Sequence, residues 1–132
     1  MQRHIDLLAT LWNLWGALGL LVGLSLLLLA AGAAVPLVEL GGRAAVAAGV
    51  AAALFASTGI VALVWGGAHV WAGRLVRRRS PLGRLISLAL AVVNLLVLPF
   101  GTALGIYALW VLLTEEGRSP FVARAVPPAM PR

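Results

Sequence analysis

The stretch of residues 7–35, LLATLWNLWGALGLLVGLSLLLLAAGAAV, decides the class of fold. Its polar side chains are limited to Thr10, Asn13 and Ser25, and no charged residue interrupts it. Because an α-helix rises ~1.5 Å per residue, a helix over this stretch exceeds the ~30 Å hydrocarbon core of a bilayer. We therefore expect a transmembrane helix over about 5–35.

A cleaved signal peptide is the alternative for this first run, since the small residues 31–33 resemble a cleavage site. The apolar region of a signal peptide is only about 7–15 residues long. The run at 7–35 is longer than this, which favours an uncleaved membrane anchor.

Three further apolar runs follow the first. Residues 44–73 are rich in Ala and Gly, and we expect a helix there because lipid leaves backbone groups no partners outside the protein. Residues 81–98 and 101–115 are each short for a span and are separated by Pro99-Phe100-Gly101. Proline ends a helical hydrogen-bond ladder and glycine permits positive φ, so we interpret this tripeptide as a tight turn.

These runs predict an all-α membrane protein, a bundle of four transmembrane helices with two long helices and a short hairpin, over about 5–35, 44–73, 81–98 and 101–115. The transmembrane domain then covers 1–116, and 117–132 is a Pro- and Arg-containing cytoplasmic tail that we expect to be extended. Two alternatives remain for the last pair of helices. They form either a hairpin that re-enters without crossing or one long helix kinked at Pro99.

The composition supports this class. Of the 132 residues, 62% are hydrophobic and 11% are charged, whereas soluble domains are about 45–50% apolar and about 25% charged. The absence of cysteine excludes disulfides, thiolate metal sites and a thiol nucleophile. The net charge is +6, but the arginines lie between apolar runs rather than among exposed aromatics, so we expect no nucleic-acid partner.

The distribution of arginine predicts the orientation in a bacterial cytoplasmic membrane. The positive-inside rule places short segments rich in Lys and Arg in the cytoplasm. With four spans, one side of the membrane holds Arg43 alone, and the other side holds Arg3, Arg74, Arg77, Arg78, Arg79, Arg84, Arg118, Arg124 and Arg132. We therefore expect both termini to be cytoplasmic.

The arginine-rich loop between the second and third helices has two interpretations. Its arginines either determine topology or bind the anionic head groups of lipids, and the two roles are compatible. The residues concerned are Arg74, Arg77, Arg78, Arg79 and Arg84.

The aromatic residues gather in the half of the membrane nearest the predicted cytoplasmic face. Tryptophan and tyrosine prefer the interface because each combines an apolar ring with one polar group. We expect interfacial positions for Trp12, Trp15, Trp65, Trp71, Tyr107 and Trp110.

The predicted spans contain no Asp, Glu, Lys or Arg away from their ends. Coupled transporters need ionisable groups at depth, and the membrane-embedded glutamate on which the small multidrug transporters depend has no counterpart here. No paired carboxylates, Ser–His pair or metal-ligand set is visible. The sequence therefore predicts neither an enzyme nor a bound cofactor.

His69 lies about one turn from the inner end of the second helix, beside Trp65 and Trp71. The simpler interpretation is an interfacial residue or a hydrogen bond between helices. We expect such bonds among Asn13, His69 and Tyr107, which lie at similar depths. The alternative is a haem or quinone site, with His4 at the same membrane face as a second ligand.

Asn94 and Thr102 flank the turn at Pro99 and Gly101, which leaves backbone groups without helical partners. We expect Thr102 to be the N-cap of the last helix and Asn94 to reach a freed group across the hairpin.

Two G-x-x-x-G patterns, Gly19–Gly23 and Gly101–Gly105, allow helices to approach closely in lipid. Packing within one chain is favoured over dimerisation for both.

The segment 94–113, NLLVLPFGTALGIYALWVLL, resembles a pattern in small uncharacterised bacterial membrane proteins. In those proteins two long hydrophobic helices precede an arginine-rich loop, here 74–84, and a hairpin with a Pro-Phe-Gly-Thr turn and a Leu-Gly-x-Tyr-x-Leu-Trp stretch. The resemblance covers most of the chain and is specific in the last third. It implies a four-helix architecture and carries no activity.

The leading function hypothesis is an accessory or scaffold protein of the membrane, which packs its helices against itself or a larger complex. The first alternative is an oligomeric channel or carrier for a small solute. The second is a haem- or quinone-linked redox subunit that uses His69.

Overall fold

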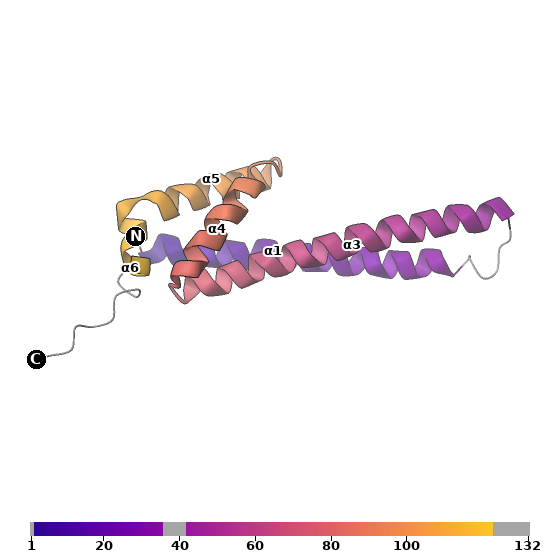
Figure 1. Cartoon of the computed structure of the whole chain (residues 1–132), viewed down its shortest axis with the longest axis horizontal. Coiled ribbons are helices and arrows are strands. Elements are labelled where there is room, and N and C mark those ends of the chain that lie inside the picture. The colour runs from indigo at the N-terminus through magenta and orange to yellow at the C-terminus, as the bar shows by residue number, and fades with distance from the viewer. Residues whose placement is uncertain (1, 36–41, 123–132) are drawn as a thin grey trace, which may run out of the picture. The chain divides into compact units, whose positions relative to one another are not determined.

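The computed structural model describes residues 2–35 and 42–122, and its regular secondary structure there is entirely helical (Figure 1). The helices are α1 (Gln2–Ala34), α3 (Gly42–Arg77), α4 (Pro81–Asn94), α5 (Phe100–Leu113) and α6 (Glu115–Val122). This confirms the all-α class. It also confirms two long apolar helices, since α1 and α3 are both long and apolar enough to cross a membrane.

The predicted bounds of the short hairpin are wrong by several residues. Both α4 and α5 have 14 residues, and α4 ends at Asn94 rather than at 98. The last four-residue bond of α4 runs from the N–H of Leu95 to the Ala91 carbonyl, and the N–H groups of Leu96 and Val97 bond carbonyls only three residues back. Proline disfavours the α conformation at the residue before it. Pro99 also has no N–H to donate to the carbonyl of Leu95. The hydroxyl of Thr102 donates to that Leu95 carbonyl instead, at 2.9 Å.

The chain divides into two compact units. Unit 2, residues 15–68, consists of segments of α1 and α3 that run antiparallel. They approach closely at glycines: a methyl group on Gly66 would lie 2.7 Å from the Gly16 carbonyl oxygen, and one on Gly23 would lie 2.9 Å from the carbonyl oxygen of Gly59. The pattern Gly19–Gly23 therefore packs against α3 of the same chain.

Unit 1 contains the remaining ends of α1 and α3 together with α4, α5 and α6. In Figure 1 the start of α1 lies beside α6 within this unit. Every helix contributes to one apolar core, whose buried residues are Ile5, Leu8, Ala9, Trp12, Val76, Ala91, Ala108, Val111, Leu112 and Phe121. The α1 members recur at the helical spacing i, i+3, i+4 and i+7, so one face of α1 is buried here.

The turn from α3 to α4 is a Schellman motif. Its two hydrogen bonds run from the N–H of Ser80 to the Leu75 carbonyl (3.1 Å) and from the N–H of Arg79 to the Val76 carbonyl (2.9 Å). Arg79 occupies the left-handed position, with φ of 54°, where glycine is the usual residue. Pro81 then begins α4 at a position that needs no N–H donor.

The expectation of an extended chain after residue 116 is wrong for residues 117–122, which belong to α6, and residues 123–132 lie outside the described part. The carbonyl of Thr114 accepts from the N–H groups of Gly117 and Arg118, so α6 starts directly after α5. Pro120 lacks the N–H that would reach the Glu116 carbonyl, and the Ser119 hydroxyl donates there at 3.1 Å. Phe121 is thereby held in the core of unit 1.

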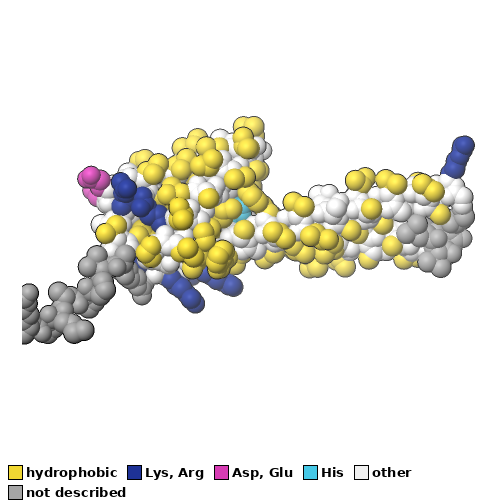
Figure 2. Space-filling view, in the orientation of Figure 1, with side chains coloured by type: hydrophobic (Ala, Val, Ile, Leu, Met, Phe, Trp, Pro, Cys, Tyr) yellow, Lys and Arg dark blue, Asp and Glu magenta, His cyan; other side chains and the backbone are white. Residues whose placement is uncertain are grey.

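Apolar side chains cover the outside of both units (Figure 2). On unit 2, Leu21 is 64% exposed and Val61 is 67% exposed. On unit 1, the turn between α4 and α5 carries Leu96 and Leu98, which are 81% and 79% exposed.

Candidate functional site

The most enclosed polar group of unit 1 is a pair formed by His69 of α3 and Asn94 of α4. Both residues are fully buried, and Nδ2 of Asn94 lies 2.7 Å from Nε2 of His69. The same Nδ2 donates to the Leu90 carbonyl at 2.9 Å. The Asn94 amide therefore contacts both the His69 ring and the backbone of its own helix.

Trp12 of α1 completes this cluster. It is fully buried, and its ring centroid lies 4.9 Å from that of His69 at an interplanar angle of 49°. Three buried polar atoms in the described part of the chain have no hydrogen-bond partner: Nε1 of Trp12, Oγ of Ser87 and Oδ1 of Asn94. Ser87 and Asn94 share the buried face of α4, two turns apart.

His4 belongs to a second, separate cluster. Its Nδ1 lies 3.2 Å from the hydroxyl of Tyr107, and its ring meets that of Trp110 edge-on, with centroids 5.6 Å apart. The rings of Tyr107 and Trp110 also contact each other, at 6.2 Å. The three rings therefore pack on one another.

The structure shows partners outside the expected group for Asn13, His69 and Tyr107. The Asn13 amide donates to the Ala9 carbonyl of its own helix at 2.6 Å, while His69 contacts Asn94 and Tyr107 contacts His4. Counting residues along a helix gives depth but not the direction in which a side chain faces, so these partners could not be predicted.

The predicted roles of Thr102 and Asn94 also need correction. The N-cap of α5 is Pro99, with no side-chain cap, and Thr102 lies three residues further on. Its hydroxyl instead reaches back to the end of α4. Asn94 bonds its own helix and α3 rather than a group across the hairpin.

The glycines of α5 lie where α4 and α5 come closest. A methyl group on Gly105 would lie 2.6 Å from the Ala91 carbonyl oxygen, and one on Gly101 would lie 2.9 Å from the Asn94 carbonyl oxygen. The pattern Gly101–Gly105 therefore packs within the hairpin.

The five arginines of the loop between α3 and α4 differ in the contacts that they make. Arg79 forms an ion pair with Asp6 at 3.0 Å, and Nε of Arg84 donates to the Leu112 carbonyl at 3.2 Å. Arg77 makes the longer contact of 3.5 Å with the Thr10 hydroxyl. These contacts connect the loop to α1 and α5. Arg74 and Arg78 are both exposed.

The predicted interfacial aromatics differ in exposure. Trp12 is fully buried, and its ring packs in the protein core beside His69. Trp71 and Trp110 are about half exposed, at 53% and 51%. In unit 2, Trp15 and Trp65 are intermediate in exposure, as is Tyr107 of unit 1.

Sequence reasoning missed three residues of this unit: Ser87, Asp6 as the partner of Arg79, and Phe121. A signal for Phe121 existed, because Thr114 followed by Glu115 and Glu116 is a typical helix start, with a capping hydroxyl and acids in the first turn. No local pattern could have paired Asp6 with a residue 73 positions away.

Comparison of this chain with protein-family models, with curated proteins and with solved structures found no match.

Proposed function

We propose that the chain is a small integral protein of the bacterial cytoplasmic membrane that serves as an accessory or scaffold subunit and acts through helix packing. The observation that carries this proposal is the exposure of apolar side chains around α1 and α3. A helix of a soluble protein hides its apolar stripe in a core, whereas a helix that is apolar all round is suited to lipid.

The length of α3 supports a complete crossing. Arg43 and Arg74 lie near opposite ends of this helix, and at ~1.5 Å per residue they are about 46 Å apart. A bilayer is about 40–45 Å thick including its head groups. Each arginine can then reach a head-group region while the apolar residues between them face lipid.

The short hairpin supports a re-entrant arrangement. Helices of 14 residues are about 21 Å long and do not cross a ~30 Å hydrocarbon core. The backbone of the turn has internal partners, including the Thr102 hydroxyl on Leu95 and the N–H of Thr102 on the Val97 carbonyl. In this arrangement α4 and α5 enter and leave on the cytoplasmic side, and both termini are cytoplasmic.

The topology is testable by labelling, because the chain has no cysteine of its own. Single cysteines at Arg43, Ser80 and Leu98 are exposed to a membrane-impermeant maleimide on intact cells. We expect that only Arg43→Cys reacts on intact cells. Ser80→Cys should react only after the cells are opened. Labelling of Leu98→Cys from outside would mean a full crossing, and labelling of Ser80→Cys would invert the topology.

The accessory role is tested by purifying the full chain in its native lipids and weighing the intact assembly by mass spectrometry. A stoichiometric larger partner is the expected result. A pure homo-oligomer that conducts a solute would favour the channel or carrier alternative. Recovery of the chain in a detergent-free soluble fraction would overturn membrane insertion itself.

The redox alternative has less support from the contacts of the two histidines. Nε2 of the buried His69 lies 2.7 Å from Nδ2 of Asn94, and Nδ1 of His4 lies 3.2 Å from the hydroxyl of Tyr107. The two histidines thus belong to different clusters. A Soret band in protein expressed with haem available would reinstate this alternative.

A further inference from the structure

We infer that Trp71 and Arg74, on the exposed face of the last turns of α3, bind the head group of an anionic phospholipid. This inference rests on the proposed membrane location and adds to it a specific lipid contact. The partner is phosphatidylglycerol or another lipid with net negative charge, rather than a zwitterionic lipid.

The first observation is that the loop arginines are not equivalent. Arg79 is held by Asp6 and Arg84 by the Leu112 carbonyl, so their side chains serve contacts within the protein. Arg74 is exposed, and its side chain forms no hydrogen bond or ion pair with any residue of 2–35 or 42–122. Its guanidinium is therefore available to a partner outside the chain.

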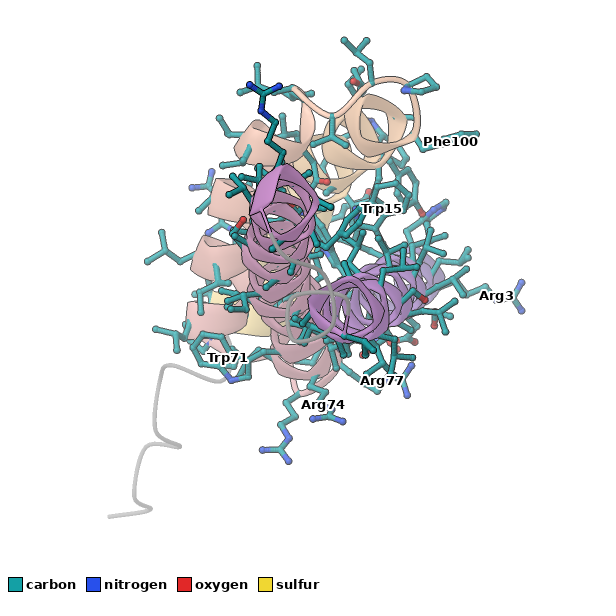
Figure 3. All side chains as sticks on the ribbon, turned by 90° about the vertical axis from the view of Figure 1, so that its right-hand side faces the viewer. Arg3, Trp15, Trp71, Arg74, Arg77 and Phe100 are labelled. Carbon is teal, nitrogen blue, oxygen red and sulfur yellow. The ribbon has the colours of Figure 1, made fainter. Side chains whose placement is uncertain are left out.

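The second observation is the position of Trp71. It lies one helical turn before Arg74, on the same face of α3, and is 53% exposed. In Figure 3, Arg74 and Arg77 extend away from the lower side of the ribbon, Trp71 lies on the opposite side of Arg74 from Arg77, and Arg3 points elsewhere. A tryptophan ring seats at the level of the lipid carbonyls with its N–H toward water.

The chemistry of the two side chains selects the ligand. A guanidinium can donate two parallel hydrogen bonds to a phosphate. In a zwitterionic lipid the ammonium group of the head balances that phosphate, so the gain in electrostatic attraction is greatest for an anionic lipid. The Trp71 ring, one helical turn deeper than Arg74, can pack against the glycerol region of the same lipid. An arginine alone would offer the lipid no such contact.

The test uses the full chain purified in detergent and titrated with phosphatidylglycerol, with phosphatidylcholine and with inorganic phosphate, and bound lipid is counted by native mass spectrometry. We expect tighter binding of phosphatidylglycerol, and Arg74→Gln should weaken it about fivefold with little effect on phosphatidylcholine. Trp71→Ala should weaken the binding of both lipids. The matched control is Arg43→Gln, which removes an exposed arginine at the other end of the same helix and should leave this affinity unchanged.

Equal losses for Arg74→Gln and Arg43→Gln would overturn the inference, because a general attraction between charges would then suffice. Displacement of the lipid by millimolar inorganic phosphate would also overturn it, in favour of a site for a free anion. Unchanged thermal midpoints of the variants exclude misfolding. If the wild-type chain resides in the membrane but shows no lipid preference, this inference fails and the proposed function stands. Recovery of the chain as a soluble protein would instead contradict the proposed membrane location, on which the proposed function depends.

Discussion

Nδ2 of Asn94 lies 2.7 Å from Nε2 of His69, and both side chains are fully buried. The same nitrogen donates to the Leu90 carbonyl of its own helix. This one bond joins α3 to the hairpin through the core of unit 1.

Replacing Asn94 by leucine should lower the stability of the protein by about 1–3 kcal/mol, because the buried hydrogen bond between Asn94 and His69 is then lost. The measurement is the thermal midpoint in detergent. The control is Val93→Leu, a change at the adjacent, exposed position of α4, which should cost less than about 0.5 kcal/mol. A double-mutant cycle with His69→Ala should give a coupling near ~0.6 kcal/mol; additive effects would mean that the pair contributes nothing.

Gly105→Ala should destabilise the hairpin by about 1–3 kcal/mol. The added methyl group would lie 2.6 Å from the Ala91 carbonyl oxygen, so α4 and α5 must separate to accommodate it. Gly67→Ala is the matched control, since a methyl group there meets nothing within 4 Å, and alanine should favour the helix by up to about 1 kcal/mol. Similar midpoints for the two variants would contradict the close approach of α4 and α5.

Arg79→Gly should leave the protein about 1 kcal/mol more stable than Arg79→Ala. Both variants lose the ion pair with Asp6, so the comparison isolates the left-handed backbone at φ of 54°, which glycine adopts without strain. Thermal unfolding of the two variants side by side measures the difference. If the alanine variant were equally stable, the turn would not adopt the Schellman geometry described above.

Phe121→Ala should cost about 3 kcal/mol, because the ring is almost fully buried in the core of unit 1. Val122→Ala, at the neighbouring position that is 55% exposed, should change the midpoint little. Proteolysis offers a second readout, since loss of the Phe121 anchor should expose α6 to cleavage. Equal sensitivity of the two variants would show that α6 does not dock.

The fold class and the long helices could be predicted from the sequence because they depend on runs of one residue type, which are local. The end of α4 could not, although the responsible residue was recognised. Proline disfavours the α conformation at the residue before it, and the N–H groups of Leu96 and Val97 bond carbonyls three residues back, so the last α-helical turn is lost before the proline. Apolar composition continues through Leu98 and conceals that loss.

Several residues of the candidate site could be identified from the sequence, but the pairs that they form could not. His69, Asn94 and Tyr107 were each singled out, yet their partners are Asn94, His69 and His4. Depth along a helix follows from counting residues, whereas the facing direction depends on how helices rotate against each other. The burial of Trp12 depends on the same rotation.

The core of unit 1 joins residues from distant parts of the chain, since Ile5, Leu8 and Trp12 pack with Val111, Leu112 and Phe121. During biosynthesis the ribosome releases α1 long before α6, so the inner face of α1 stays uncovered until Phe121 has emerged. The core of unit 1 can therefore be completed only after α6 is synthesised. Nascent chains stalled before Phe121 should depend on chaperones to shield that face.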